Sequence, residues 1–399
     1  MKVLQLCNKP PYPPVDGGTL AMNSITQGLL AAGCQVRVLS VCSDKHPVRS
    51  SAVTDEYLKA TRFEAVYVNL SVRPLGAAIA LLCGESYHVK RFVSSAFANR
   101  LKEILLEESF DVIHIESIFL TPYLPLIRRY SQAKVFLRAH NVEHLIWKRI
   151  ALGERHPLKR WYLKHLSLTL RAYECEHINQ FDGVICITPN DARQFLQLGC
   201  RRPVVDIPFA VEPEPLENIS VEPNSLFHLG SMDWLPNREG IRWFLDNVWP
   251  LVHSRTPQVK LYLAGRNMSD DLLHLQLGGV VIVGEVPDAM YFIASKQINI
   301  VPLLSGSGIR VKIIEAMSAG KTVITTSIGA EGIHYTNGTH LLIADTPEEF
   351  ASQIQHCVDN PDFCTQIGHN AYQLIQEEYN NTALTNKMLN FYNKVIHPL

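Results

Sequence analysis

A short segment in the second half of the chain combines small residues, two cations and a carboxylate. It follows an apolar run that ends at Pro302 and reads Ser305-Gly306-Ser307-Gly308-Ile309-Arg310-Val311-Lys312-Ile313-Ile314-Glu315. Small residues let the backbone approach a ligand, and a helix that begins here would offer unpaired N–H groups and partial positive charge. Arg310 and Lys312 add two full charges, and Glu315 lies one turn beyond Lys312. The spacing predicts a diphosphate site with a carboxylate available for a hydroxyl group.

A second candidate lies where an apolar run at 134–137 gives way to Arg138-Ala139-His140-Asn141-Val142-Glu143. Ligand sites of α/β proteins lie at the carboxyl ends of strands, so His140 is a candidate to face a ligand. A histidine taken alone is more often structural, and on the residues alone that alternative stays open. His144, in the same stretch, is interpreted as a bystander.

A third candidate, Asp16-Gly17-Gly18-Thr19, follows the first predicted strand and a proline-rich loop. Two glycines at the start of a helix would let a phosphate or a sugar approach the backbone. The segment lacks the G-x-G-x-x-G pattern of a dinucleotide site. Asp-Gly-Gly is also an ordinary turn, so this signal is weak without its context.

Short β-branched or apolar runs alternate with helical patterns along the chain. The first series of predicted strands comprises residues 3–7, 35–41, 65–69, 112–116, 134–138, 183–187 and 204–207. The second series comprises residues 226–229, 259–264, 280–283, 298–301, 322–325 and 341–344. Continuous apolar strands between helices indicate parallel sheets covered on both faces. We therefore predict an α/β fold of two doubly wound, Rossmann-like domains facing a central cleft.

The boundary between the two series is rich in proline. Residues 211–224 contain Pro213, Pro215 and Pro223 among alternating acids, so this stretch cannot continue a helix and is interpreted as a linker. We predict an N-terminal domain at 1–210, a C-terminal domain at 211–375, and a final helix at 376–399 that crosses back to the N-terminal domain.

Length and composition narrow the functional class. The 399 residues suffice for two domains, and the net charge of −1 argues against a nucleic-acid partner bound through bulk charge. The nine cysteines include no CxxC pair and are interpreted as reduced thiols. Residues 1–7 predict a strand without the features of a signal peptide, and no apolar run approaches the ~20 residues of a membrane-spanning helix. We expect a cytoplasmic protein.

These segments together resemble family 4 glycosyltransferases of the GT-B fold, over nearly the whole chain. The resemblance rests on the opening strand with its Gly-Gly loop and on three motifs: His140-Asn141-x-Glu143, Gly230-x-x-x-Trp234-x-Pro236-Asn237, and Glu315-Ala316-Met317-x-x-Gly320. It implies a retaining enzyme that moves a sugar from a nucleotide-diphosphate donor to a glycan, glycolipid or small-molecule acceptor. On this basis Asn237 could face the cleft, although a role in a turn is equally compatible with its position.

The resemblance also implies roles for single residues. Glu315 would bind the nucleotide ribose, and His140 would face the donor sugar. We take both residues, together with Arg310 and Lys312, as the catalytic set. The implied donor-binding positions are Gly17, Gly18, Gly230, Arg266, Val286, Ser307, Gly308 and Ile309. The implied acceptor or orienting positions are Asp16, Asn141 and Glu143.

Two departures from the family pattern change this expectation. Ser307 stands where a first glutamate is usual, and Ser231 follows Gly230 where many relatives have arginine. We infer that Arg310 and Lys312 carry the phosphate charge instead, since arginine can bind phosphate oxygens bidentately. No Asp-x-Asp motif occurs. The sequence therefore predicts no divalent metal and no cofactor. Because the resemblance implies retention and no carboxylate is clearly placed as a nucleophile, we expect a same-face displacement in which the departing phosphate takes the acceptor proton.

Residues 147–171 form a basic stretch with interleaved aromatic residues and a single acid, Glu154. Basic helices with interfacial aromatics can lie on anionic membranes. We predict a peripheral membrane contact here, at the inner face of a membrane, and with it a lipid-linked acceptor. An ordinary basic surface helix is an equally open interpretation.

Two other functional classes remain compatible with the residues. A nucleotide-sugar epimerase of the same architecture would bind the same donor without an acceptor. A non-catalytic nucleotide-sugar or glycan-binding relative would account for Ser307 and Ser231. The Glu-Ala-Met helix and the His-Asn-x-Glu segment favour transfer over both.

Overall fold

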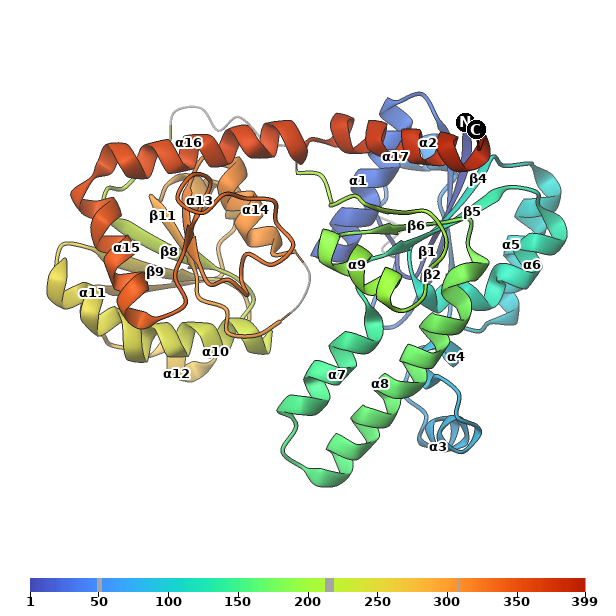
Figure 1. Ribbon diagram of the computed structural model, residues 1–399, viewed down its shortest axis with the longest axis horizontal. Coiled ribbons are helices and arrows are strands. Elements are labelled where there is room, and N and C mark those ends of the chain that lie inside the picture. Colours follow the sequence, from blue (N-terminus) through green and yellow to red (C-terminus); the bar gives the residue numbers. More distant parts are fainter. Residues whose placement is uncertain (49–51, 212–218, 307–308, 399) are drawn as a thin grey trace. The chain divides into compact units, whose positions relative to one another are not determined.

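The computed structural model describes residues 1–48, 52–211, 219–306 and 309–398. The chain divides into two compact units (Figure 1). Unit 1 comprises residues 1–210 and 381–399, and unit 2 comprises residues 211–380. Each unit is built around one parallel sheet, of seven strands in unit 1 and six in unit 2. The predicted α/β class with two parallel sheets is confirmed.

The strands of unit 1 are β1 (Lys2–Cys7), β2 (Gln35–Cys42), β3 (Glu64–Tyr67), β4 (Val112–Ile115), β5 (Lys134–Ala139), β6 (Gly183–Cys186) and β7 (Val204–Asp206). Those of unit 2 are β8 (Ser225–Leu229), β9 (Lys260–Ala264), β10 (Val280–Gly284), β11 (Ile298–Val301), β12 (Thr322–Thr325) and β13 (Leu342–Ile343). Each predicted strand is present within two residues of its expected ends, because apolar runs bounded by turn residues are a strong local signal.

The helices of unit 1 are α1 (Gly17–Ala31), α2 (Asp55–Thr61), α3 (Pro74–Cys83), α4 (Tyr87–Lys90), α5 (Ser95–Glu107), α6 (Leu124–Tyr130), α7 (Glu143–Gly153), α8 (Pro157–His177), α9 (Pro189–Gln197) and α17 (Asn381–Ile396), with the 3₁₀ turns η2 (Ile118–Tyr123) and η3 (Ile178–Gln180). Those of unit 2 are α10 (Leu235–Trp243), the π-helical η4 (Phe244–Val248), α11 (Trp249–Arg255), α12 (Asp270–Leu273), α13 (Ala289–Ala294), α14 (Val311–Ser318), α15 (Pro347–Asp359) and α16 (Pro361–Glu378).

The two sheets share one strand order. It is β3-β2-β1-β4-β5-β6-β7 in unit 1 and β10-β9-β8-β11-β12-β13 in unit 2. β1 pairs in parallel with β2 from Lys2 opposite Gln35, and with β4 from Val3 opposite Val112. The order therefore reverses between β1 and β4, and in unit 2 between β8 and β11. Open α/β sheets bind ligands outside the carboxyl ends of the strands at such a reversal.

Both faces of the unit 1 sheet are buried, as alternation along β1 illustrates. Leu4 and Leu6 point to the layer that contains α5, while Val3 and Cys7 point to the layer formed by α1 and α17 (Figure 1). Successive side chains of a strand point to opposite faces, so a strand covered on both sides must be apolar throughout. Gln5 is the exception, and its partners belong to the candidate site below.

The last helix packs on unit 1. Its buried side chains repeat at helical spacing and form one stripe against α1 and the sheet: Leu384, Thr385, Met388, Phe391 and Tyr392. The boundary predicted at 375/376 falls inside α16, which continues to Glu378, and the chain passes from unit 2 to unit 1 at residues 380–381. Of the predicted linker, residues 212–218 lie outside the described part of the chain.

Close approach between α1 and α17 depends on Gly28. A Cβ added there would lie 2.0 Å from Oγ1 of Thr385 and 2.6 Å from Oδ1 of Asn381. Thr385 is buried and β-branched, so its side chain has little freedom to move aside within a helix.

The basic stretch predicted at 147–171 is a helical hairpin rather than a single helix. α7 ends at Gly153 and α8 begins at Pro157, with Glu154 to His156 at the turn. In Figure 1 the two helices project from the body of unit 1, with α3 near the same end. Among the described residues, no helix is long and apolar enough to cross a membrane.

Gly28→Ala should destabilise unit 1, although alanine is the better helix former by about 1 kcal/mol. The added methyl group meets Thr385 and Asn381, and overpacking of this kind costs about 1–3 kcal/mol. Calorimetric unfolding should show a lower Tm. Gly153→Ala, at the end of α7 with open space around its Cβ, is the matched control and should leave Tm unchanged or raise it. A Tm for Gly28→Ala at or above that of the wild type would contradict the packing described.

Candidate functional site

The donor-side candidates of unit 2 lie at the carboxyl ends of β8, β9 and β10. The N–H of Gly230 donates to the carbonyl of Ala264 (3.1 Å), and that of Gly265 donates to the carbonyl of Gly284 (2.8 Å). Gly265 has φ of 145°, and a Cβ there would lie 1.8 Å from the carbonyl oxygen of Gly230. Backbone hydrogen bonds therefore tie the loops after these strands to one another.

The ammonium of Lys312 lies directly beside Gly230. A Cβ at Gly230 would sit 2.6 Å from Nζ, which donates to Oδ1 of Asn237 (2.5 Å) and lies 3.5 Å from Nε2 of His228. His228 donates from Nδ1 to the carbonyl of Ile300 (2.9 Å), so its Nε2 turns a lone pair toward the ammonium. These contacts place a cation at the end of β8, beside the position where Ser231 stands.

The surroundings of Lys312 lower the pKa of its ammonium group. Burial and the neighbouring charge of Arg310 lower the pKa of Lys312 to about 7, against a smaller opposing effect of Glu315. Burial and the charge of Lys312 also hold the pKa of His228 well below its usual value. An anion placed beside Lys312 would supply the missing counter-charge and favour the protonated amine.

Arg310 is the N-cap residue of α14, so it precedes the first helical turn in which the sequence analysis placed it. Its side chain is buried, with Nη2 3.5 Å from the carbonyl of Ile328 and its guanidinium carbon 5.8 Å from the ring centroid of Trp234. Nζ of Lys312 lies 5.9 Å from the same ring. A Cβ at Gly306 would meet Nη2 at 3.0 Å. Both cations therefore lie within cation–π range of the Trp234 ring.

Glu315 lies in α14, one turn after Lys312, and is half-buried. Burial raises its pKa, and the charge of Lys312 partly offsets that rise. A carboxyl group in this setting can accept a hydrogen bond from a hydroxyl group or, when protonated, donate one.

The remaining donor-side candidates are more peripheral. Arg266, after β9, is exposed, while Val286 and Ile309 are half-buried. Ser231 directs its hydroxyl to Oδ1 of Asp233 (2.5 Å). Ser307 and Gly308 lie outside the described residues.

In unit 1 the sequence candidate His140 is held by a carboxylate that the sequence analysis missed. Nε2 of His140 lies 2.9 Å from Oε2 of Glu116, which immediately follows β4 at the strand-order reversal. Burial lowers the pKa of His140 despite this partner. A neutral ring must use its proton on Nε2 to donate to the carboxylate, so Nδ1 carries a lone pair that can accept a hydrogen bond.

Glu116 is fully buried and joins several elements of unit 1. It accepts from Nε2 of Gln5 (2.6 Å) on β1 and lies 3.2 Å from Nε2 of His114 on β4. Burial alone would raise the pKa of this carboxyl, but His114 and His140 lower it well below its usual value, with help from the charge of Arg138. His114 in turn contacts the hydroxyl of Tyr392 on α17.

Asp16 and the two glycines are organised by Lys9. Nζ of Lys9 lies 2.7 Å from Oδ1 of Asp16, and Asp16 caps α1 by accepting from the N–H of Thr19 (2.8 Å). Gly17 and Gly18 are the first residues of α1, and a Cβ at Gly18 would meet Nζ of Lys9 at 2.9 Å. The charge of Lys9 also lowers the pKa of His140. Asp16 is thus engaged in capping and ion pairing rather than held free for an acceptor.

Glu143 opens α7 beside a second buried carboxylate. Oε1 of Glu174 accepts from the N–H of Glu143 (2.8 Å), and Oε2 lies 2.5 Å from Nδ1 of His144. Burial, and then the charge of Glu174, raise the pKa of Glu143 to about 8, while a hydrogen bond from Asn141 opposes the rise. His144 is therefore structural, and Glu143 can hold a proton near neutral pH, which suits an acid or base.

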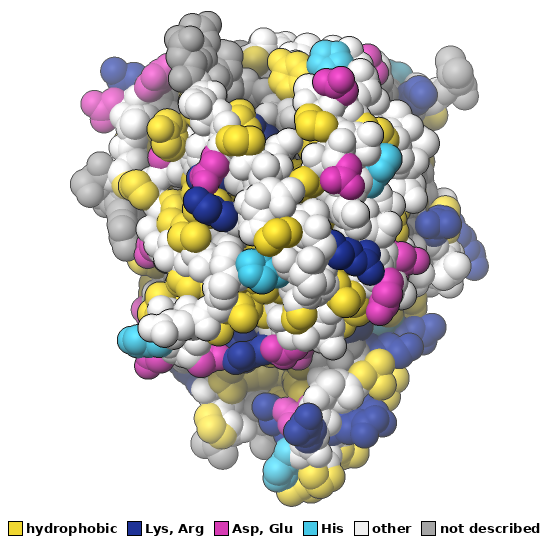
Figure 2. Space-filling model, turned by 90° about the vertical axis from the view of Figure 1, so that its left-hand side faces the viewer, with side chains coloured by type: hydrophobic (Ala, Val, Ile, Leu, Met, Phe, Trp, Pro, Cys, Tyr) yellow, Lys and Arg dark blue, Asp and Glu magenta, His cyan; other side chains and the backbone are white. Residues whose placement is uncertain are grey.

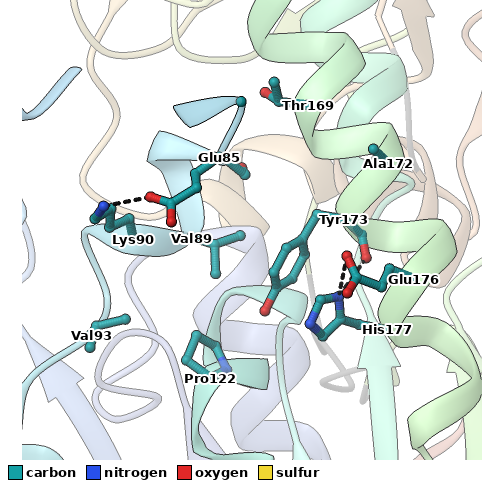
Figure 3. A pocket seen from close by; sticks show the side chains of 12 residues that line it. Glu85, Val89, Lys90, Val93, Pro122, Thr169, Ala172, Tyr173, Glu176 and His177 are labelled. Atoms are coloured by element: carbon teal, nitrogen blue, oxygen red, sulfur yellow. Dashed lines mark hydrogen bonds and ion pairs between the residues drawn. The ribbon is translucent and has the colours of Figure 1, made fainter. Parts of the chain in front are cut away.

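A pocket of about 760 Å³ lies against α8, outside all of these groups. Figure 3 shows the ring of Tyr173 between Val89, Pro122 and His177, and the rings of Tyr173 and His177 stack at 3.9 Å. The twelve side chains drawn there include none of the predicted site residues. Its volume falls in the range of small-molecule sites. Tyr173 directly precedes Glu174, so one turn of α8 serves both the pocket and the start of α7.

Several of the residues described here escaped the sequence analysis. Glu116 is the last residue of the predicted strand 112–116, and Lys9 comes two residues after the predicted strand 3–7. Those positions were the available signal. His228 lies inside a strand, where nothing in the sequence separates it from a core residue. Trp234 was part of a recognised motif, but its contact with both cations depends on the fold of α10 against α14.

The comparisons with known proteins agree with this geometry. Residues 15–215 match the sequence model of the family described as "Glycosyltransferase Family 4", and residues 223–360 match "Glycosyl transferases group 1". The chain is 28% identical over 293 residues to an uncharacterized 44.6 kDa protein in the cps region of Klebsiella pneumoniae, covering 70% of this chain and 74% of that protein.

Solved structures with the same fold cover nearly the whole chain. The Anabaena protein HepE in complex with UDP has a TM-score of 0.68 and 14% identity, over 99% of this chain and 100% of that one. Staphylococcus aureus TarM, solved with fondaparinux, α-GlcNAc-glycerol and UDP, has a TM-score of 0.66 and 13% identity, over 98% and 100%. The chain is therefore a member of glycosyltransferase family 4 with the GT-B fold.

Proposed function

We propose that this glycosyltransferase takes its sugar from a nucleotide-diphosphate donor, retains the anomeric configuration and works without a metal or a cofactor. The observation that carries the proposal is the pair of cations at the start of α14. Arg310 and Lys312 both lie close to the ring of Trp234, and burial together with the charge of Arg310 lowers the pKa of Lys312. UDP is the first nucleotide to test, because HepE and TarM are solved with it.

In this proposal, groups at and near the start of α14 bind the donor. Arg310, Lys312 and the N–H groups at the helix start stabilise the charge that develops on the departing diphosphate. Glu315 receives a ribose hydroxyl. Since Lys312 lies against Gly230, it takes the place of the arginine that many relatives carry at Ser231.

His140 acts on the sugar. Its Nδ1 lone pair accepts a hydrogen bond from a sugar hydroxyl, and the ionised Glu116 behind it favours positive charge at the anomeric carbon. The anomeric carbon–oxygen bond to phosphate breaks while the acceptor oxygen bonds on the same face. The acceptor proton passes to the departing phosphate, so the enzyme contributes positioning and electrostatics. Glu143, with its pKa near 8, is placed to orient the acceptor hydroxyl.

The acceptor in this proposal is a glycan or a lipid-linked sugar presented at a membrane surface. TarM supports a glycan class, because its structure was solved with glycan ligands. The basic hairpin of α7 and α8 supports a membrane contact, since cations and exposed apolar side chains occur together there.

The affinity for UDP should depend on the protonation of Lys312. Above about pH 7 the free amine predominates, so UDP should bind more weakly as pH rises, by up to about tenfold per unit. Binding near neutral pH should be accompanied by proton uptake, because the diphosphate raises the pKa of the amine. Calorimetric titration in buffers of different ionisation enthalpy measures both quantities.

Lys312→Arg is the matched control, because arginine stays charged across this range. It should flatten the pH dependence, whereas Lys312→Met should weaken UDP binding by roughly 1.5–3 kcal/mol at neutral pH. A wild-type affinity that does not change between neutral and alkaline pH would overturn the assignment of Lys312.

His140→Ala should separate catalysis from donor binding. Release of UDP from a UDP-sugar in water should fall by about 10²–10⁴-fold, the usual contribution of a positioned polar group in the transition state. Thermal stabilisation by UDP should remain, because the groups assigned to the nucleotide lie in unit 2. His397→Ala, exposed in the same unit, is the control and should match the wild type. Unchanged hydrolysis in His140→Ala would remove His140 from the mechanism.

A further inference from the structure

We propose that the exposed side of the α7–α8 hairpin and the neighbouring helix α3 form one docking surface for an anionic lipid bilayer. The proposal deepens the membrane contact of the proposed function and identifies the side chains that make it. The docking surface comprises Ile79 of α3, Ile150 and Leu152 of α7, and Leu158, Trp161 and Leu168 of α8, with the cations around them.

Large apolar side chains are exposed along one stripe of α8. Leu158, Trp161 and Leu168 are 73%, 58% and 66% exposed. They stand at i, i+3 and i+10, which a helix places on the same side. Single exposed apolar residues are ordinary, but a stripe of them on a projecting helix indicates a partner.

A basic stripe runs beside the apolar one. Arg160, Lys164 and Arg171 stand at i, i+4 and i+11 on α8, so they share the adjoining side, and all three are exposed. The turn adds Arg155 and Lys159, and Lys159 pairs with Glu154 at 2.6 Å. Apolar side chains bordered by cations match the interface between acyl chains and anionic headgroups. Figure 2 shows dark blue and yellow side chains gathered at its lower end.

The structure changes which aromatic residues belong to this surface. Trp147 was part of the predicted contact, but its ring stacks on the buried His88 at 4.2 Å. Tyr162 likewise packs against an internal cluster. Trp161 is the aromatic residue of the hairpin that remains well exposed among those described.

Helix α3 supplies a second apolar element that the basic pattern could not indicate. Its ten residues include no charged side chain, and Ile79 is 53% exposed. It is too short to span a bilayer, which takes ~20 residues. A small cluster joins α3 and α4 to both hairpin helices: Ala80, Tyr87, Ala151, Leu163 and Leu166. The hydroxyl of Tyr87 also accepts from the N–H of Arg73 (2.7 Å), just before α3. α3 and the hairpin are therefore packed together through this cluster, and we infer that their exposed side chains contact the same bilayer.

Sedimentation with vesicles of phosphatidylcholine, with and without phosphatidylglycerol, tests the proposal on the full chain. The wild type should bind the anionic vesicles at low salt and lose much of that binding at high salt. Arg160→Gln with Lys164→Gln should weaken binding by about fivefold for each cation removed. Leu158→Ser with Trp161→Ser, and separately Ile79→Ser, should weaken it by roughly tenfold, because the apolar contact is lost.

Matched variants elsewhere in unit 1 control for general effects. Lys59→Gln with Arg201→Gln removes two exposed cations, and Leu106→Ser with Leu196→Ser removes two exposed leucines. Both controls should bind as the wild type does. Trp161 also reports directly, since its fluorescence should shift to the blue on vesicles and this shift should be absent from Trp161→Phe.

Three results would overturn the proposal. In the first, the wild type stays in the supernatant with anionic vesicles at low salt. In the second, the control variants lose as much binding as the docking-surface variants. In the third, the wild type self-associates instead of binding vesicles, and Leu158→Ser with Trp161→Ser abolishes that self-association. Stabilisation by UDP is measured on the same variants and should persist. Vesicle binding without a UDP effect would refute the proposed function alone, and the reverse would refute the docking surface alone.

Discussion

The fold of unit 1 depends on compensation of one buried charge. Removing a carboxylate from water costs several kcal/mol unless partners replace the solvent. Glu116 meets this requirement with Gln5 on β1, His114 on β4 and His140 after β5, and His114 carries the network on to Tyr392 of α17. The same carboxylate thus fixes the tautomer and orientation of the residue assigned to the sugar. The contacts of Glu116 therefore join the elements of this unit and also orient the ring of His140.

Unit 2 shows a different arrangement, in which two cations lie close together. Arg310 and Lys312, at the start of α14, lie 5.8 Å and 5.9 Å from the ring centroid of Trp234. Burial and mutual repulsion lower the pKa of Lys312 to about 7. Such a site gains from an anion twice, through attraction and through relief of the repulsion. Lys312 therefore places a cation at the end of β8, where the chain has Ser231 and no arginine.

The hairpin of α7 and α8 is a third feature of the chain and belongs to unit 1. Its inner side holds the buried Glu174 that supports the start of α7, and its outer side carries apolar and basic stripes. Packing against the core of unit 1 does not account for the exposed apolar and basic side chains of this hairpin. α7 begins three residues after His140, so the hairpin and the segment that carries His140 are close in sequence.

The sequence by itself determined the strands, the parallel α/β class, the family, the strand-end positions of His140 and Gly230, and the place of Lys312 near the start of a helix. It could do so because apolar periodicity and motif spacing are local properties. Only the tertiary structure decided which groups meet. Glu116 pairs with His140, and His228 and Asn237 lie around the ammonium of Lys312, although these residues are far apart in the chain. The stacking of Trp147 on His88, while Trp161 stays exposed, likewise depends on how α7 and α8 pack. Burial and charge compensation arise from such non-local contacts, and no spacing along the chain encodes them.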